Sequence, residues 1–127
     1  INFIKKNTEM KTLVLGATTN KDRYAYKAIH SLIGKNHQVV AIGSRKGMAL
    51  DIPIETEKMP YHGIDTVTLY LNPVHQREYY DYIISLKPRR VIFNPGTENP
   101  EFYTLLDENG IEYDVACTLV LLATNQY

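Results

Sequence analysis

The segment of residues 16–22 carries the small and polar side chains that a diphosphate-binding turn requires. Small residues let backbone N–H groups approach an anion, hydroxyl and amide groups donate further hydrogen bonds, and nearby cations add attraction. The residues that supply these features are Gly16, Ala17, Thr18, Thr19, Asn20, Lys21 and Arg23, and Tyr24 follows in a position to act as a lid. The three-glycine dinucleotide fingerprint is absent. A strand-to-helix turn without a ligand is therefore the alternative.

A second candidate segment, residues 43–47, contains Ser44, Arg45 and Lys46 between two glycines. An NAD-binding domain usually has an acidic residue at the end of the second strand, where it bonds the ribose hydroxyls. The two cations found here suit a phosphorylated ribose, because a carboxylate would repel the phosphate and an arginine can bind it with paired hydrogen bonds. This chemistry leaves open whether the group is the 2′-phosphate of NADP or the 3′-phosphate of coenzyme A. Two solvated charges on a loop are the alternative.

Residues for catalysis or metal binding form no recognisable pattern. The histidines have no metal-ligand spacing among themselves or with Cys117, and there is no serine elbow and no pair of acids with acid–base spacing. We therefore predict no metal and no catalytic residue, and we expect a binding protein rather than an enzyme.

The composition fits one cytoplasmic domain. The chain has 127 residues, 44% of them hydrophobic, which is enough for a single core. Lysine and arginine total 14 and so do aspartate and glutamate, so net charge gives no case for nucleic acid or an anionic membrane. A single cysteine and the lack of a long apolar run make the cytoplasm the expected compartment. We expect residues 1–9 to be a frayed extension or a remnant of the expression vector, and residues 10–127 to form the domain.

Strand and helix patterns alternate along the chain. Buried-strand runs occur at residues 12–15, 39–42, 66–71, 90–93 and 111–115, with a short edge strand at 52–54 where a proline is tolerated. Helical spacing begins at Asp22, and Asn-Pro pairs at 72–73 and 99–100 cap two further helices, of which the first runs to about Leu86. A short helix is expected at 118–123. The alternation predicts a single doubly wound, Rossmann-like α/β domain with a mainly parallel sheet of five or six strands and helices on both faces.

The strand ends of such a sheet define one candidate site. Because parallel strands finish at the same edge, the segments that follow them come together there, and open α/β sheets bind their ligands at that edge. The segments concerned are residues 16–22, 43–47, 71–73, 94–97 and 116–117.

The ordered set of these pieces resembles the CoA-binding domain family, a Rossmann-like module also found at the start of the succinyl-CoA synthetase α subunit and in short stand-alone bacterial proteins. The resemblance covers Lys11 to about Gln126. The pieces that carry it are Thr12-Leu13-Val14-Leu15-Gly16-Ala17-Thr18, Asp22-Arg23-Tyr24, the basic turn 43–47, Leu71-Asn72-Pro73, Phe93-Asn94-Pro95-Gly96 and Val115-Ala116-Cys117.

The resemblance implies coenzyme A as the cofactor. Residues 16–21 would then meet the diphosphate, residues 44–46 the 3′-phosphate and adenine side, and residues 71–73 with 94–96 the rest of the molecule. Many members have Asn-Pro-Lys where this chain has Ser44-Arg45-Lys46, which leaves the choice between the two cations open. Many also have proline where Thr118 follows Cys117. Cys117 would lie at the ligand edge, either as a thiol that forms a mixed disulfide with coenzyme A or as a buried, inert one.

Three functions fit this sequence. The first is non-catalytic binding of coenzyme A or an acyl-CoA, because no second domain for acyl or nucleotide chemistry is recognisable. The second is an NADP-dependent oxidoreductase, which the two cations of the basic turn would suit. The third is a ligand-free module that contacts another protein, and a homo-oligomer or a protein partner is compatible with each of the three.

Overall fold

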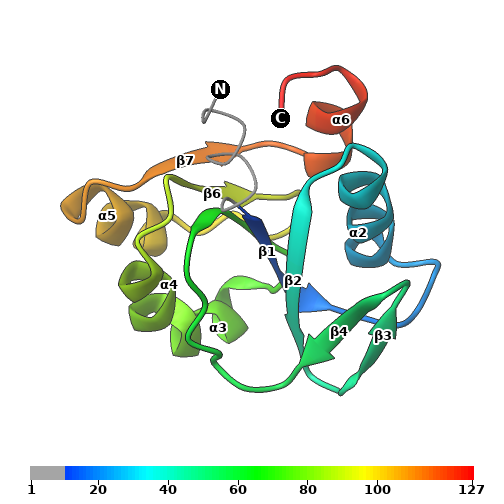
Figure 1. Ribbon diagram of the computed structural model, residues 1–127. Coiled ribbons are helices and arrows are strands. Elements are labelled where there is room, and N and C mark those ends of the chain that lie inside the picture. Colours follow the sequence, from blue (N-terminus) through cyan, green and yellow to red (C-terminus); the bar gives the residue numbers. More distant parts are fainter. Residues whose placement is uncertain (1–10) are drawn as a thin grey trace, which may run out of the picture.

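The computed structural model describes residues 11–127, and the extension expected at residues 1–9 lies outside the described residues. The chain alternates strands and helices from β1 to α6 (Figure 1). The elements are β1 (Lys11–Ala17), α2 (Tyr24–Gly34), β2 (Gln38–Gly43), β3 (Gly47–Ala49), β4 (Ile52–Glu55), β5 (Ile64–Leu69), α3 (Pro73–Gln76), the 3₁₀ turn η1 (Arg77–Tyr79), α4 (Tyr80–Leu86), β6 (Arg90–Phe93), α5 (Pro100–Glu108), β7 (Glu112–Val115) and α6 (Thr118–Ala123).

Seven strands form one sheet in the order β3-β4-β2-β1-β5-β6-β7. All neighbouring strands pair in parallel except β3 and β4, which form an antiparallel hairpin. The predicted Rossmann-like α/β class is confirmed, whereas the predicted count of five or six strands is too low. The missed strand, β3, has three residues, which is too short for a hydrophobic period to show in the sequence.

The strand that contains Pro53 was predicted at the edge of the sheet, and that position is wrong. β4 lies between β2 and β3, so β3 forms the edge. Pro53 pairs with Met48 of β3, and the ladder with β2 begins one residue later at Ile54. The missing N–H of the proline is tolerated because the parallel ladder does not extend to it.

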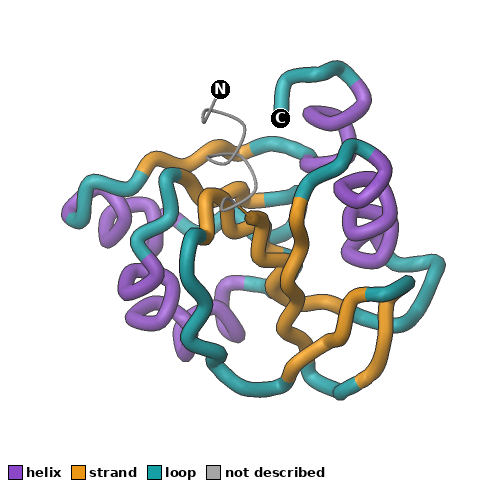
Figure 2. Tube along the Cα trace, in the orientation of Figure 1, coloured by secondary structure: helices purple, strands orange, loops and turns teal. Residues whose placement is uncertain are grey.

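Two apolar layers lie on opposite faces of the sheet. Along β1 the side chains alternate: Leu13 and Leu15 belong to one buried cluster, and Val14 belongs to the other. The first cluster includes Ile83 of α4 and residues of α5, and the second includes residues of α2 and α6. Figure 2 shows these two groups of helices on either side of the strands. The parallel centre of the sheet is therefore buried on both faces, as its continuous apolar runs predict.

Asparagine caps fix two helix starts as predicted. The side chain of Asn72 accepts a hydrogen bond from the backbone N–H of His75 (3.0 Å), and Asn99 does the same for Phe102 (3.2 Å). The helix predicted from Pro73 to Leu86 is divided by η1 into α3 and α4. Among residues 11–127, no helix is long and apolar enough to cross a membrane.

Candidate functional site

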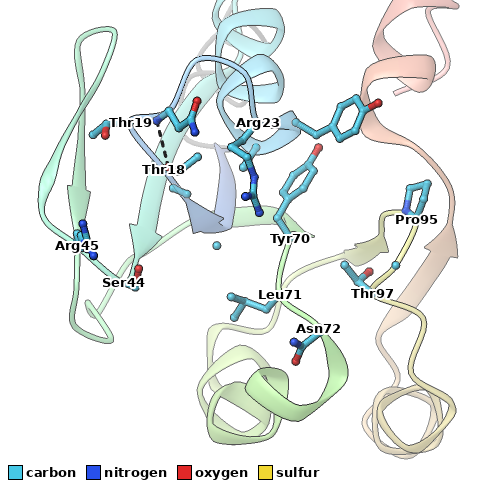
Figure 3. Close-up of a pocket in the computed structure, with 16 residues that line it drawn as sticks. Thr18, Thr19, Arg23, Ser44, Arg45, Tyr70, Leu71, Asn72, Pro95 and Thr97 are labelled. Carbon is cyan, nitrogen blue, oxygen red and sulfur yellow. Dashed lines mark hydrogen bonds between the residues drawn. The ribbon is translucent and has the colours of Figure 1, made fainter.

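A cavity of about 790 Å³ lies at the carboxyl edge of the sheet, the edge predicted for ligand binding. Its walls come from the turn between β1 and α2 and from the loops that follow β2, β5 and β6 (Figure 3). This volume is within the range of small-molecule and cofactor sites. A smaller cavity of about 460 Å³ lies around Lys11, Arg90 and Tyr127, near the start of β1.

Most of the residues predicted to bind the ligand line the larger cavity. They are Gly16, Ala17, Thr18, Thr19, Asn20, Arg23, Tyr24, Ser44, Arg45, Leu71, Asn72, Pro95 and Gly96. Five predicted residues are not part of the lining: Lys21, Lys46, Pro73, Asn94 and Cys117. Two lining residues, Ala25 and Tyr70, lie outside the predicted segments, and Thr97 lies within the predicted segment 94–97 but was not named as a binding residue.

Gly16 permits a close backbone contact at the centre of the pocket. Its φ angle is +99°, a conformation that residues with a side chain rarely adopt. A Cβ atom on Gly16 would lie 2.9 Å from the carbonyl carbon of Tyr70. The β1–α2 turn and the end of β5 therefore pack backbone against backbone.

Two further glycines bring the basic turn against the β1–α2 turn. A Cβ atom on Gly43 would lie 2.2 Å from the carbonyl oxygen of Ala17, and one on Gly47 would lie 2.6 Å from Cγ2 of Thr19. Both ends of the segment 43–47 are thus fixed to the turn beside it, while Ser44, Arg45 and Lys46 between them are exposed.

Hydrogen bonds within the β1–α2 turn define which of its donors face outward. The N–H of Asn20 is bound by Thr18 Oγ1 (3.1 Å), and the N–H of Asp22 is bound by Asn20 Oδ1 (2.9 Å). Among residues 11–127, the backbone N–H groups of Thr18 and Thr19 have no acceptor. These two groups, together with the remaining side-chain donors of the turn, can receive an anion.

Helix α2 also begins at this cavity. The helix was predicted from Asp22 but starts at Tyr24, because residues 20–23 form a separate turn in which the N–H of Arg23 bonds the carbonyl oxygen of Asn20 at 3.1 Å. Its N-cap, Arg23, makes no side-chain capping bond, unlike the asparagines of α3 and α5. The first N–H groups of α2 therefore present the positive end of the helix dipole to the pocket.

Two arginines give the cavity its positive charge. Arg23 and Arg45 both line it, and neither guanidinium forms an ion pair with any residue in the range 11–127. Figure 3 shows Arg23 directed into the middle of the pocket and Arg45 at the side formed by the basic turn. The two arginines thus give the cavity two separate positions that can bind an anionic group.

Tyr70 is the largest lining side chain that the sequence prediction missed. It follows β5, and Figure 3 shows its ring between the β1–α2 turn and the loop that contains Pro95. Burial raises the pKa of its phenol to about 12, an effect that outweighs the lowering influence of the Thr118 and Thr68 hydroxyls. The phenol is therefore uncharged at neutral pH and does not repel an anionic ligand.

Asn94 connects the end of β5 to the start of α6 beside the cavity. Its side chain is buried, with Nδ2 donating to Thr68 Oγ1 (2.7 Å) and to the carbonyl oxygen of Leu69 (2.9 Å). Its Oδ1 accepts from the backbone N–H of Thr118 (2.8 Å) at the start of α6. Every polar atom of this amide thus has a protein partner, and Cys117, the residue before α6, is half-buried outside the cavity lining.

The lining, as formed by residues 11–127, contains no histidine, cysteine, lysine, aspartate or glutamate. Its ionisable side chains are those of Arg23, Tyr24, Arg45 and Tyr70. Within the described part of the chain, no group of three or more histidine, cysteine, aspartate or glutamate side chains could hold a metal ion. The lining can therefore bind anionic groups through its arginines and hydroxyl donors, and apolar groups through Leu71 and Pro95.

Solved structures support the fold. An uncharacterized protein of known crystal structure is 50% identical in sequence, with a TM-score of 0.90, and the match covers 92% of this chain and 97% of that one. A protein from Thermus thermophilus is 18% identical, with a TM-score of 0.80 over 99% of this chain and 97% of that chain. A hypothetical protein from Pyrococcus horikoshii OT3 is 24% identical, with a TM-score of 0.78 over 87% of this chain and 79% of that chain. The last two likenesses concern the Rossmann-like fold alone.

The family follows from the sequence itself. The model of the CoA binding domain family matches residues 10–123, and this chain therefore belongs to that family, as the resemblance predicted. Membership supports the binding of coenzyme A in general. No curated protein matches the chain significantly.

Proposed function

We propose that this protein binds coenzyme A or an acyl-CoA in the cavity at the carboxyl edge and does not transform it chemically. The observation that carries the proposal is the pair of unpaired arginines, Arg23 and Arg45, that line one cavity in a chain of the CoA binding domain family. Coenzyme A has two anionic positions, the diphosphate and the ribose 3′-phosphate, and the two arginines supply one cation for each.

The diphosphate binds at the β1–α2 turn in this proposal. Thr18, Thr19, Arg23 and the first residues of α2 all line the cavity there, and the N–H groups of Thr18 and Thr19 have no acceptor among residues 11–127. Such a combination of backbone donors, helix dipole and cation is the usual arrangement for a phosphate group. Arg23 takes the role that the sequence had divided between Lys21 and Arg23, because Lys21 is not part of the lining.

The 3′-phosphate binds at the basic turn, with Ser44 as a hydroxyl donor and Arg45 as the cation. Lys46 is exposed outside the lining, which favours Arg45 of the two candidates. The arm of the cofactor then runs toward the opposite wall, where Leu71, Asn72 and the loop 95–97 line the cavity. The described lining contains no histidine, cysteine, lysine, aspartate or glutamate, and we therefore propose a non-catalytic role.

The decisive experiment is a thermal-shift titration of the whole chain with coenzyme A, dephospho-coenzyme A, NADPH and NADH. A ligand that binds only the folded state raises the stability by RT ln(1 + [L]/Kd). We expect stabilisation in the order coenzyme A, then dephospho-coenzyme A, with no response to the nicotinamide cofactors. Stabilisation by NADPH without coenzyme A would favour the oxidoreductase alternative, and no response to any of the four would favour the protein-contact alternative.

A further inference from the structure

A buried amide joins two loops that line the cavity. Gln76, at the end of α3, is 0% exposed and is not itself a lining residue. Its Nε2 donates to the backbone carbonyl oxygens of Leu71 and Thr97, each at 2.8 Å. Its Oε1 accepts from Nδ2 of Asn99 at 2.8 Å. Each loop thus accepts one hydrogen bond from the same nitrogen atom, and every polar atom of the Gln76 side chain has a partner.

The backbone pairing of the sheet does not extend to these two loops. The last paired residues of β5 and β6 are Leu69 and Phe93, so the backbone ladder ends before the loops begin. Among residues 11–127, the hydrogen bonds that connect residues 70–72 with residues 95–98 all pass through Gln76. Asn94 connects the same two loops nearer the sheet, because its Nδ2 donates to the carbonyl oxygen of Leu69 (2.9 Å) and its own carbonyl oxygen accepts from the N–H of Thr97 (3.0 Å). Farther from the sheet, the separation between Leu71 and Thr97, and hence the width of the cavity at this wall, depends on Gln76.

The amide is itself held in a fixed orientation. Asn99, which donates to Gln76, also caps α5 through Phe102 and donates to the hydroxyl of Tyr80 (2.8 Å). A fully satisfied buried network of this kind rigidifies the segments that it joins and favours one geometry. Replacing a single member by an apolar residue is costly, because the buried partners of that member lose their hydrogen bonds.

We infer that Gln76 is a positioning residue for the bound ligand: it fixes the distance between the Leu71 and Thr97 loops and thereby sets the affinity for the arm of coenzyme A. This inference rests on the proposed function. Gln76 affects the ligand only through the two backbone segments that it bridges. Its loss will therefore weaken binding of the arm, whereas the phosphorylated adenosine end, on the opposite side of the cavity at Arg45, will bind as before.

The test compares two probes, coenzyme A and adenosine 3′,5′-bisphosphate, which has both phosphate positions but no arm. In the Gln76→Met variant we expect the Kd of coenzyme A, measured by calorimetry, to rise about tenfold, while the Kd of adenosine 3′,5′-bisphosphate changes less than twofold. The matched control is Ile83→Ala, a fully buried residue of α4 that makes no bond to either loop. This control lowers the melting temperature but leaves the ratio of the two Kd values unchanged.

A second variant and a ligand-free measurement guard against misfolding. Gln76→Glu keeps the side-chain length and places a carboxyl oxygen against two carbonyl acceptors, so the same change in the ratio is expected. Hydrogen exchange without ligand should be faster in either variant at the amides of Tyr70 and Thr97, which bond the carbonyl oxygens of Leu15 and Asn94 in the parent. An unchanged ratio in both variants, with coenzyme A still bound by the parent, overturns the inference alone. If the parent binds neither probe, the proposed function fails and the inference fails with it.

Discussion

Replacing Arg45 with alanine tests the assignment of the 3′-phosphate most directly. Arg45 is exposed, lines the cavity and forms no ion pair among the described residues, so its removal should change the stability of the free protein by less than about 0.5 kcal/mol. A hydrogen bond between charged groups contributes roughly 1.5–3 kcal/mol, and solvent exposure favours the lower end of that range. We expect the Kd of coenzyme A to rise about tenfold.

The same loss can be expressed as a thermal shift. At a fixed, saturating concentration of coenzyme A, a tenfold weaker Kd removes about 1.4 kcal/mol of ligand-induced stabilisation. For a domain of this size, that corresponds to a melting temperature about 5 °C lower than that of the parent with the same ligand. The Kd values themselves are measured by isothermal calorimetry at constant ionic strength.

The chain offers a matched control for this prediction. Lys46→Ala removes the same charge one residue later, outside the cavity lining, and should raise the Kd of coenzyme A no more than about twofold. Dephospho-coenzyme A, which lacks the 3′-phosphate, should bind the Arg45→Ala variant as well as it binds the parent. If both variants weaken coenzyme A equally, the effect is general electrostatic attraction and the specific contact is refuted. If Arg45→Ala weakens the binding of coenzyme A and of dephospho-coenzyme A equally, Arg45 does not contact the 3′-phosphate.

Three further perturbations address the framework of the site. Gly16→Ala should lower the free energy of unfolding by roughly 1–3 kcal/mol, seen as an earlier urea midpoint, because of the positive φ and the close carbonyl of Tyr70. Asn94→Ala leaves the N–H of Thr118 without its acceptor and should lower the free energy of unfolding by about 2–4 kcal/mol, measured in the same way. Asn72→Ala, which removes only an exposed helix cap, should lower it by about 1 kcal/mol. Burial raises the pKa of Tyr70 to about 12, so the contribution of this side chain to the free energy of unfolding is fully present below pH 10 and is lost as the pH rises from 10 to 12. The parent should lose about 2–3 kcal/mol more than Tyr70→Phe in this interval, and parallel pH curves would contradict the burial of the phenol.

Local chemistry made part of the fold predictable. The caps of α3 and α5 were found because an Asn-Pro pair ahead of a helical pattern lets the side chain bond the third N–H with the proline at the first helical position. The third such pair, Asn94-Pro95, is followed by Gly96 and forms a turn. The strand β6 was found because Val91, Ile92 and Phe93 form an apolar run, and the structure buries all four residues of the strand. In contrast, β3 is stabilised by its pairing with β4, and a pairing of three residues leaves no period in the sequence.

The site was predictable at the level of segments and less so at the level of side chains. Parallel topology brings the loops to one edge, so their meeting follows from the strand pattern alone. Which of two neighbouring cations lines the cavity depends on the dihedral angles of the turn. The sequence therefore could not distinguish Arg23 from Lys21, or Arg45 from Lys46, and the structure does. Tyr70 was missed because the predicted strand 66–71 included it, whereas β5 ends at Leu69 and leaves Tyr70 as the first residue of the loop.

The two glycine contacts of the basic turn also bear on how ligand selectivity can change. Gly43 and Gly47 fix the backbone on both sides of three exposed residues, and the anchoring atoms belong to Ala17 and Thr19 of the neighbouring turn. Side chains at positions 44–46 can therefore be exchanged without disturbing any packed neighbour, whereas any larger residue at position 43 would displace the turn itself. Selectivity between ribose substituents can therefore change without a change in the turn that binds the diphosphate. An acidic residue at position 45 would favour nucleotides with an unphosphorylated ribose, because a carboxylate bonds the ribose hydroxyls and repels a phosphate.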